Sequence, residues 1–282
     1  MSSPQSTLTH ADHDALRRAA DWLAAADSLV ISAGAGMGVD SGLPDFRGTE
    51  GFWRAYPALR ASGQQFADIA NPEAFRRDPA RAWGFYGHRL GLYRATVPHA
   101  GFQILKRWAD AKPQGAFVFT SNVDGQFQKA GFPEACIEEC HGSIHHLQCL
   151  TPCTADIWRA DALIVDIDTE NCRLRSQPPR CPHCGELARP NILMFGDWGW
   201  LPHRSYEQAA RRKAWLKNVQ NPVVIELGAG TAIPSVRRFG EQLSAPLIRI
   251  NARESEVAGE GVGISLSALS ALSALDQLMT RY

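Results

Sequence analysis

Four cysteines in two closely spaced pairs give the strongest chemical signal in the chain. Three residues separate Cys149 from Cys153, and two separate Cys181 from Cys184, so each pair can chelate one ion. Four thiolates form a closed tetrahedral shell, which predicts a structural Zn²⁺ and not a metal that activates water. Three histidines nearby are alternative ligands, although the cysteines already complete the shell: His145, His146 and His183.

A glycine-rich run follows an apolar segment, in the sequence ISAGAGMGVDSGLPDFRG over residues 31–48. Where a strand leads into a helix, glycines let a pyrophosphate approach free backbone N–H groups, so Gly34, Ala35 and Gly36 are candidates for dinucleotide binding. Glycine also simply ends strands, and both interpretations stay open from the loop alone. The Pro-Asp-Phe-Arg that follows places an acid, a ring and a guanidinium in succession, which favours a functional loop.

Apolar runs alternate with helix-like segments along most of the chain. They predict strands within residues 28–34, 115–122, 137–142, 222–230 and 246–251. These runs lack the alternation of a half-exposed strand, so we expect an α/β fold with a doubly wound, parallel, Rossmann-like sheet. Residues 49–98 are aromatic-rich and helical in pattern, and we expect a helical cofactor-loop module there. Residues 145–195 hold the cysteine pairs, and we expect an inserted zinc-ribbon module there.

Composition restricts the partners and the compartment. The formal net charge is zero and the pI is near 7.1, which argues against nucleic acid or an anionic membrane as a partner. No run of 18 apolar residues occurs, and the N-terminus lacks the basic and apolar regions of a secretory signal. The seven cysteines are an odd number, so we expect a reducing, cytoplasmic environment.

The glycine run resembles the opening motif of the sirtuin family, the NAD-dependent protein deacylases. Further matches follow in the family's order: TSNVDGQFQKAG from Thr120, CHGS with His141, ARPNILMFGD, ELGAG with Gly228, and IN with Asn251. The four cysteines stand where the family places its zinc ligands. The resemblance covers residues 10–282 and implies a single catalytic domain over 9–282, NAD as cofactor, one structural Zn²⁺, and an acylated protein or peptide lysine as substrate.

The resemblance also implies a role for each matching residue. In the family's reaction the acyl oxygen of a modified lysine attacks C1′ of the nicotinamide ribose, nicotinamide leaves, and an alkylimidate of ADP-ribose forms. His141 would then take a proton from a ribose hydroxyl that attacks the imidate, a task suited to imidazole near neutral pH. Asn122 and Asp124 would hold the nicotinamide end. The remaining cofactor contacts would be Gly34, Ala35, Gly36, Asp45, Phe46, Arg47, Gly228 and Asn251.

From their types alone, these residues also have bland interpretations. A histidine after a buried strand is often a core residue, Asn122 and Asp124 could form a turn, and Arg47 could be a surface arginine. Tyr86 and Arg89 lie three apart on a predicted helix and could grip the carboxylate of a succinyl-type acyl group. They could equally belong to a helical core stripe, with Arg89 extending to solvent.

Some positions depart from the family pattern. Ala229 and Gly230 replace Thr-Ser, Asp197 replaces a glutamate, and Trp198 and Trp200 lie in a lengthened loop beside the expected peptide cleft. The expected function is an NAD-dependent lysine deacylase (deacetylase or desuccinylase) that releases nicotinamide and O-acyl-ADP-ribose. The altered loop leaves two alternatives: an NAD-dependent ADP-ribosyltransferase or glycohydrolase, and a non-enzymatic protein that senses NAD or ADP-ribose.

Overall fold

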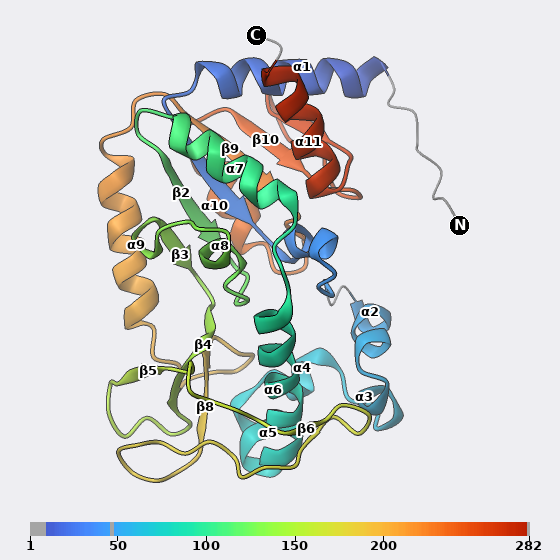
Figure 1. The fold of residues 1–282 in the computed structure, drawn as a ribbon, viewed down its shortest axis with the longest axis vertical. Helices are drawn as coiled ribbons and strands as arrows, with labels where there is room; N and C mark the ends of the chain where they lie inside the picture. The colour runs from blue at the N-terminus through green and yellow to red at the C-terminus, as the bar shows by residue number, and fades with distance from the viewer. Residues whose placement is uncertain (1–9, 46–47, 281–282) are drawn as a thin grey trace. The chain divides into compact units, whose positions relative to one another are not determined.

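The structure, a computed structural model, describes residues 10–45 and 48–280 (Figure 1). They form two compact units. The first consists of residues 10–40, 99–119 and 213–280, and the second of residues 41–45, 48–98 and 120–212. None of the helices in these ranges combines the length and the apolar character that a membrane span requires.

The first unit is a Rossmann-like α/β fold, as the sequence predicts. Its strands lie in the order β11-β10-β9-β1-β2, and the pairs β11–β10, β10–β9 and β9–β1 are parallel. The continuous apolar runs are buried along their whole length in β1 and β2, as expected for strands covered on both faces. The strands are β1 (Ser28–Ala33), β2 (Ala116–Thr120), β9 (Pro222–Leu227), β10 (Leu247–Ile250) and β11 (Val262–Ile264).

Helices follow the strands of this unit. The helix α10 packs on β1 and β9, whereas α11 packs against both α1 and α7. A short 3-10 helix, η1 (Ala35–Ser41), begins directly after β1. The α-helices are α1 (His10–Ala25), α7 (Ala100–Ala111), α10 (Ser235–Glu241) and α11 (Ala268–Met279).

The second unit contains residues 49–98 and 145–195, the ranges for which two modules are expected. Pro57, Pro72 and Pro79 interrupt the helical pattern because each stands at the first position of a new helix, where its missing N–H costs nothing. The helices are α2 (Gly48–Ala55), α3 (Pro57–Ala61), α4 (Phe66–Ile69), α5 (Pro72–Arg77), α6 (Pro79–Ala95), α8 (Gln126–Lys129) and α9 (His203–Leu216), which ends beyond this unit, with the 3-10 turn η2 (Glu134–Cys136).

The zinc-module region has short strands joined by longer irregular segments. An antiparallel sheet has the order β5-β4-β8, and β6 pairs with β7. The helical and zinc modules share one core, in which Phe85 and Trp83 of α6 pack with Cys172 and Ile192. The strands are β3 (Ile137–Glu139), β4 (Gly142–Cys149), β5 (Ile157–Arg159), β6 (Ile167–Asp168), β7 (Arg173–Leu174) and β8 (Ala188–Ile192).

Candidate active site and metal centre

The glycines after β1 and β9 pack against one another. The Gly34 N–H donates to the Leu227 carbonyl at 2.9 Å, and the Gly36 N–H donates to the Gly228 carbonyl at 3.0 Å. A Cβ atom on Gly36 would lie 2.7 Å from the Gly228 Cα, and Gly228 itself has a φ of 60°. Close backbone packing thus accounts for these glycines. It also holds both loops at the carboxyl edge of the sheet, where α/β folds bind dinucleotides. Ala35 is exposed at this edge.

Asn251 joins the loop after β10 to the loop after β9. Its side-chain amide donates to the Ala229 carbonyl at 2.8 Å, and its Oδ1 accepts from the N–H groups of Arg253 and Glu254 at 3.0 and 3.1 Å. The residue is buried. The side chain that the resemblance assigns to the adenosine ribose therefore also fixes the backbone around that position.

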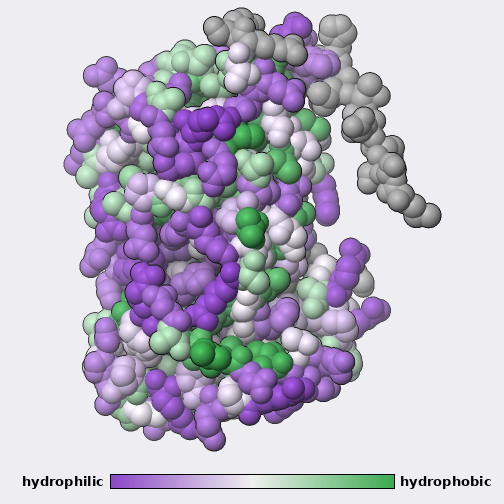
Figure 2. Space-filling model, viewed as in Figure 1, coloured by the Kyte–Doolittle hydropathy of each residue, from purple (hydrophilic) through white to green (hydrophobic). Residues whose placement is uncertain are grey.

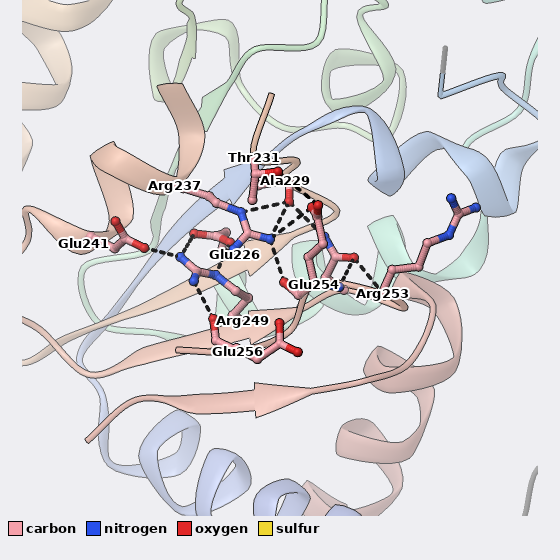
Figure 3. Close-up of polar contacts among 10 residues, drawn as sticks. Glu226, Ala229, Thr231, Arg237, Glu241, Arg249, Arg253, Glu254 and Glu256 are labelled. Carbon is pink, nitrogen blue, oxygen red and sulfur yellow. Dashed lines mark hydrogen bonds and ion pairs between the residues drawn. The ribbon is translucent and has the colours of Figure 1, made fainter. Parts of the chain in front are cut away.

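A buried charge network stabilises the strands beneath these loops (Figure 3). The Arg249 guanidinium donates to both Glu226 carboxylate oxygens, at 2.5 and 3.0 Å, to Glu241 at 2.7 Å, and to the Glu256 carbonyl. These carboxylates raise the pKa of Arg249 despite its burial, which alone would lower that pKa. The carboxyl ends of β9 and β10 thereby acquire fixed positions.

Pro44 and Asp45, the first two residues of the Pro-Asp-Phe-Arg sequence, belong to the second unit. Asp45 is half-buried. The predictions for Phe46 and Arg47 concern positions outside the described residues.

Backbone pairing in the second unit brings Asn122 and Asp124 to His141. The Cys140 N–H donates to the Thr120 carbonyl at 2.9 Å, and the Ile144 N–H donates to the Val123 carbonyl at 3.0 Å. The two chain segments therefore run side by side, with Asn122 and His141 between the two hydrogen bonds. The pattern of a strand followed by polar residues predicts each segment, but the proximity of the two segments comes from tertiary pairing.

Asp124 is a buried carboxyl group at the end of this turn. Its Oδ1 accepts from the Gln126 N–H at 2.9 Å, and its main-chain carbonyl accepts from His145 Nε2 at 2.9 Å. Burial raises the pKa of Asp124 to about 6, and the Glu139 carboxylate adds to this increase, while Arg89 opposes it. Asp124 is thus ionised at neutral pH with little margin.

His141 is half-buried, and its main-chain carbonyl accepts from the Leu193 N–H at 3.0 Å. Burial lowers the pKa of His141, so the imidazole is neutral near pH 7 and can accept a proton. The next residue must be glycine, because Gly142 has a φ of 79° and a Cβ atom there would lie 2.0 Å from the Asn191 carbonyl oxygen. The His-Gly pair is therefore a requirement of the local backbone as well as of the proposed chemistry.

Tyr86 and Arg89 both lie on the buried side of α6. Arg89 donates from Nε and Nη2 to the Tyr93 hydroxyl, at 3.0 and 2.7 Å, and its guanidinium lies 5.7 Å from the Tyr86 ring centroid. Arg89 is only 7% exposed, so it does not extend to solvent as a core-stripe interpretation would have it. Burial raises the pKa of Tyr86 to about 12, which keeps its phenol protonated and able to donate a hydrogen bond.

The four predicted metal ligands converge. The Cys149 and Cys184 sulfurs lie 3.7 Å apart, those of Cys153 and Cys181 lie 3.6 Å apart, and all four lie within 4.8 Å of one another. Tetrahedral sulfurs around a Zn²⁺ with bonds of about 2.3 Å lie about 3.8 Å apart. The arrangement fits a closed tetrathiolate zinc site, and we assign it a structural Zn²⁺.

The loop after β8 is anchored by a buried ion pair. Arg189 donates to both Asp197 carboxylate oxygens at 2.6 and 2.8 Å, and both side chains are fully buried. Asp197 also accepts from the N–H groups of Met194 and Gly199 at 3.3 and 3.1 Å. The aspartate that replaces the family's glutamate is therefore a structural anchor of its own loop.

The two tryptophans of this loop differ in environment. Trp198 is 100% exposed, whereas Trp200 is half-buried. Leu193 and Phe195, in the preceding segment, are also exposed. Figure 2 shows that apolar residues on the face in view form separate groups among hydrophilic ones. The Trp198 side chain is therefore available to solvent, whereas the Trp200 side chain is partly covered.

Arg189→Met should lower the free energy of unfolding by about 3–5 kcal/mol, because it leaves the Asp197 carboxylate buried without its partner. The matched control is Arg76→Met, which breaks the exposed 3.4 Å pair with Glu73 and should cost less than about 1 kcal/mol. Urea unfolding followed by circular dichroism measures both values. Equal, small losses in the two variants would contradict the anchoring role of Arg189.

Sequence reasoning missed three side chains that support these groups. Tyr93 binds Arg89, His145 binds the Asp124 carbonyl, and Arg237 binds the Ala229 carbonyl. Tyr93 stands four residues after Arg89 on one helix, a spacing that could have revealed it. The other two contacts cross a loop, over 21 residues for His145 and eight for Arg237, and no local pattern signals them.

Comparison with known proteins places the chain in a family. The Sir2 family model matches residues 34–225. An NAD-dependent protein deacylase 2 of Pyrobaculum aerophilum is 31% identical over 84% of this chain and 85% of its own length. An NAD-dependent protein deacylase 1 of Pseudomonas aeruginosa is 32% identical over 84% of this chain and 87% of its own length.

The fold agrees with this match. The solved structure of a Sir2 homolog–NAD complex superposes with a TM-score of 0.67 at 22% identity, covering 94% of both chains. The family match includes the Asn122–Asp124 turn, His141 and the four clustered cysteines. The chain therefore belongs to the Sir2 family, the sirtuins.

Proposed function

We propose that this chain is an NAD-dependent protein lysine deacylase that releases nicotinamide and O-acyl-ADP-ribose, with His141 as general base. The observation that carries the proposal is the Sir2 match over residues 34–225, because this range holds His141, Asn122 and Asp124. The two deacylases described above support the same activity, since each aligns with most of this chain.

The proposed roles follow from the chemistry of each group. Bound NAD supplies the electrophilic ribose carbon and the nicotinamide leaving group. Neutral His141 accepts the proton of a ribose hydroxyl, Asp124 accepts a hydrogen bond from the nicotinamide carboxamide, and Asn122 orients the same end. On the dinucleotide side we assign Gly34, Ala35, Gly36, Asp45, Phe46, Arg47, Gly228 and Asn251.

We assign Tyr86 and Arg89 to acidic acyl groups such as succinyl, with acetyl as a second substrate class. A buried guanidinium in contact with phenols can exchange these contacts for a bidentate carboxylate, which is a stronger partner. A protonated Tyr86 can add a hydrogen bond to the same carboxylate. These groups supply the positive charge and the donors that an acidic acyl chain requires.

The test is an assay of purified protein with NAD and a panel of acetyl-, succinyl- and longer-acyl-lysine peptides, read by mass spectrometry. The proposal expects nicotinamide release only when an acylated peptide is present. ADP-ribose attached to protein, or nicotinamide released without acyl-lysine, would instead favour a transferase or glycohydrolase. Arg89→Met should reduce succinyl turnover more than acetyl turnover.

The activity should fall as the pH is lowered through about 6. Burial raises the pKa of Asp124 to about 6, so its carboxylate is protonated below that pH and becomes an uncharged, weaker acceptor for the carboxamide. Burial lowers the pKa of His141, so protonation of this imidazole begins at a lower pH than is usual for histidine. The measurement is kcat/KM for NAD across this range in wild type and in Asp124→Asn. The variant should have low activity, and its kcat/KM should not fall further near pH 6. If its kcat/KM falls near pH 6 as in wild type, the titrating group is not Asp124.

A further inference from the structure

Arg237 is a buried arginine on α10 whose hydrogen bonds go to two loops of the first unit. It donates from Nε and Nη2 to the Ala229 carbonyl, at 3.2 and 3.1 Å, and from Nη2 to the Glu254 carbonyl at 2.6 Å. Figure 3 shows the guanidinium directed at both groups. Ala229 follows β9 and Glu254 follows β10, and these two strands pair in parallel. Arg237 therefore connects the carboxyl ends of adjacent strands.

The same contacts arrange a second pair of side chains. The Glu254 carboxylate lies 3.4 Å from Arg237 Nη2 and accepts from the Thr231 hydroxyl at 3.0 Å. Thr231 belongs to the loop after β9 and Glu254 to the loop after β10. Their hydrogen bond is therefore a second link between the two loops. Arg237 and the Thr231–Glu254 pair thus connect the two loops at separate points.

The orientation of one peptide group follows from these bonds. The Ala229 carbonyl accepts from Arg237 and also from the Asn251 amide, and both donors are buried. In a trans peptide the C=O and N–H point in opposite directions, and the described residues contain no cis peptide. The N–H of Gly230 therefore points away from this buried cluster, at the carboxyl edge of the sheet.

We propose that Arg237 is a positioning residue that, together with Asn251, turns the Ala229–Gly230 peptide so that its N–H donates to an oxygen of the ADP-ribose part of NAD. This inference rests on the proposed use of NAD. It explains how Ala229 and Gly230 can serve where the sequence lacks the hydroxyl side chains of the family pattern. The Gly230 N–H, held in place by the buried Arg237 guanidinium, takes the part of a side-chain hydroxyl donor.

The first test is calorimetric titration of ADP-ribose, which requires no turnover. Arg237→Gln should weaken ADP-ribose binding about tenfold, as expected for the loss of one well-oriented hydrogen bond with its supports. The KM for NAD should rise similarly, whereas kcat at saturating NAD and the KM for the acyl peptide stay within about twofold. Arg237→Lys keeps the charge but not the fork, and should give an intermediate affinity. Arg238→Gln is the matched control, because Arg238 is the exposed neighbour on the same helix, and it should bind as wild type does.

The second test measures the wild-type protein and uses a variant only to assign one resonance. In protein labelled with ¹⁵N-glycine, the Gly230 amide resonance, identified by its loss in Gly230→Ala, should shift downfield at saturating ADP-ribose. An unmoved Gly230 resonance at saturation, or a folded Arg237→Gln protein with wild-type ADP-ribose affinity, would overturn the inference. A wild-type protein that fails to bind ADP-ribose would overturn it as well. Binding without acyl-dependent turnover would instead overturn the deacylase proposal and leave the role of Arg237 standing.

Discussion

Replacing His141 by alanine should lower kcat for acyl-lysine cleavage by about 10²–10⁴, the usual contribution of a general base. The physical reason is that burial keeps this imidazole neutral near pH 7, and it lies beside the Asn122–Asp124 turn. Loss of the ring removes the only group that we assign to accept the ribose proton. Steady-state kinetics at saturating NAD and peptide give the effect directly.

Two controls separate this effect from general damage. His13→Ala removes an exposed histidine of α1 and should leave kcat unchanged. The His141→Ala protein should also keep its unfolding midpoint, because the side chain is only half-buried. Activity that survives in His141→Ala would show that another group is the base.

Removal of the metal should have the largest effect on stability. Binding of a structural Zn²⁺ to small zinc-finger peptides contributes about 10–16 kcal/mol, and here a tetrathiolate site joins the end of β4 to the segment before β8. Cys181→Ser should therefore abolish stoichiometric zinc, lower the unfolding midpoint strongly and eliminate activity. Elemental analysis and thermal unfolding measure the first two effects.

The matched control is Cys136→Ser, because Cys136 lies outside the cluster. This variant should retain one zinc per chain and the wild-type midpoint. A Cys181→Ser protein that unfolds at the wild-type temperature, or a wild-type protein purified without zinc at full stability, would contradict a structural role for the metal.

The elements that the sequence predicted are those whose signal is local. Buried strands such as β1 and β9 are continuous apolar runs, and each cysteine pair has the spacing of a chelating pair. Membership of the Sir2 family followed from motifs in their order. Each of these signals is contained in a short segment of the sequence.

The features that the sequence did not predict depend on contacts between distant segments. The backbones of Gly36 and Gly228 lie so close that neither position has room for a Cβ atom. Neither loop sequence alone indicates this close packing. From the sequence, Asp197 is a substitution in an expected substrate loop. In the structure, its carboxylate forms a buried ion pair with Arg189. Arg237 is one of two adjacent arginines in the sequence, and only burial distinguishes it from Arg238.

The stoichiometry of the products tests the central claim most directly. Purified protein is incubated with NAD and an acyl-lysine peptide, and nicotinamide, free lysine peptide and O-acyl-ADP-ribose are quantified in one mass-spectrometric run. Acyl transfer to ADP-ribose predicts that the three products form in equal amounts and that none forms without the acyl group. Nicotinamide in excess of the deacylated peptide, or the acyl group recovered initially as free carboxylate, would contradict that chemistry.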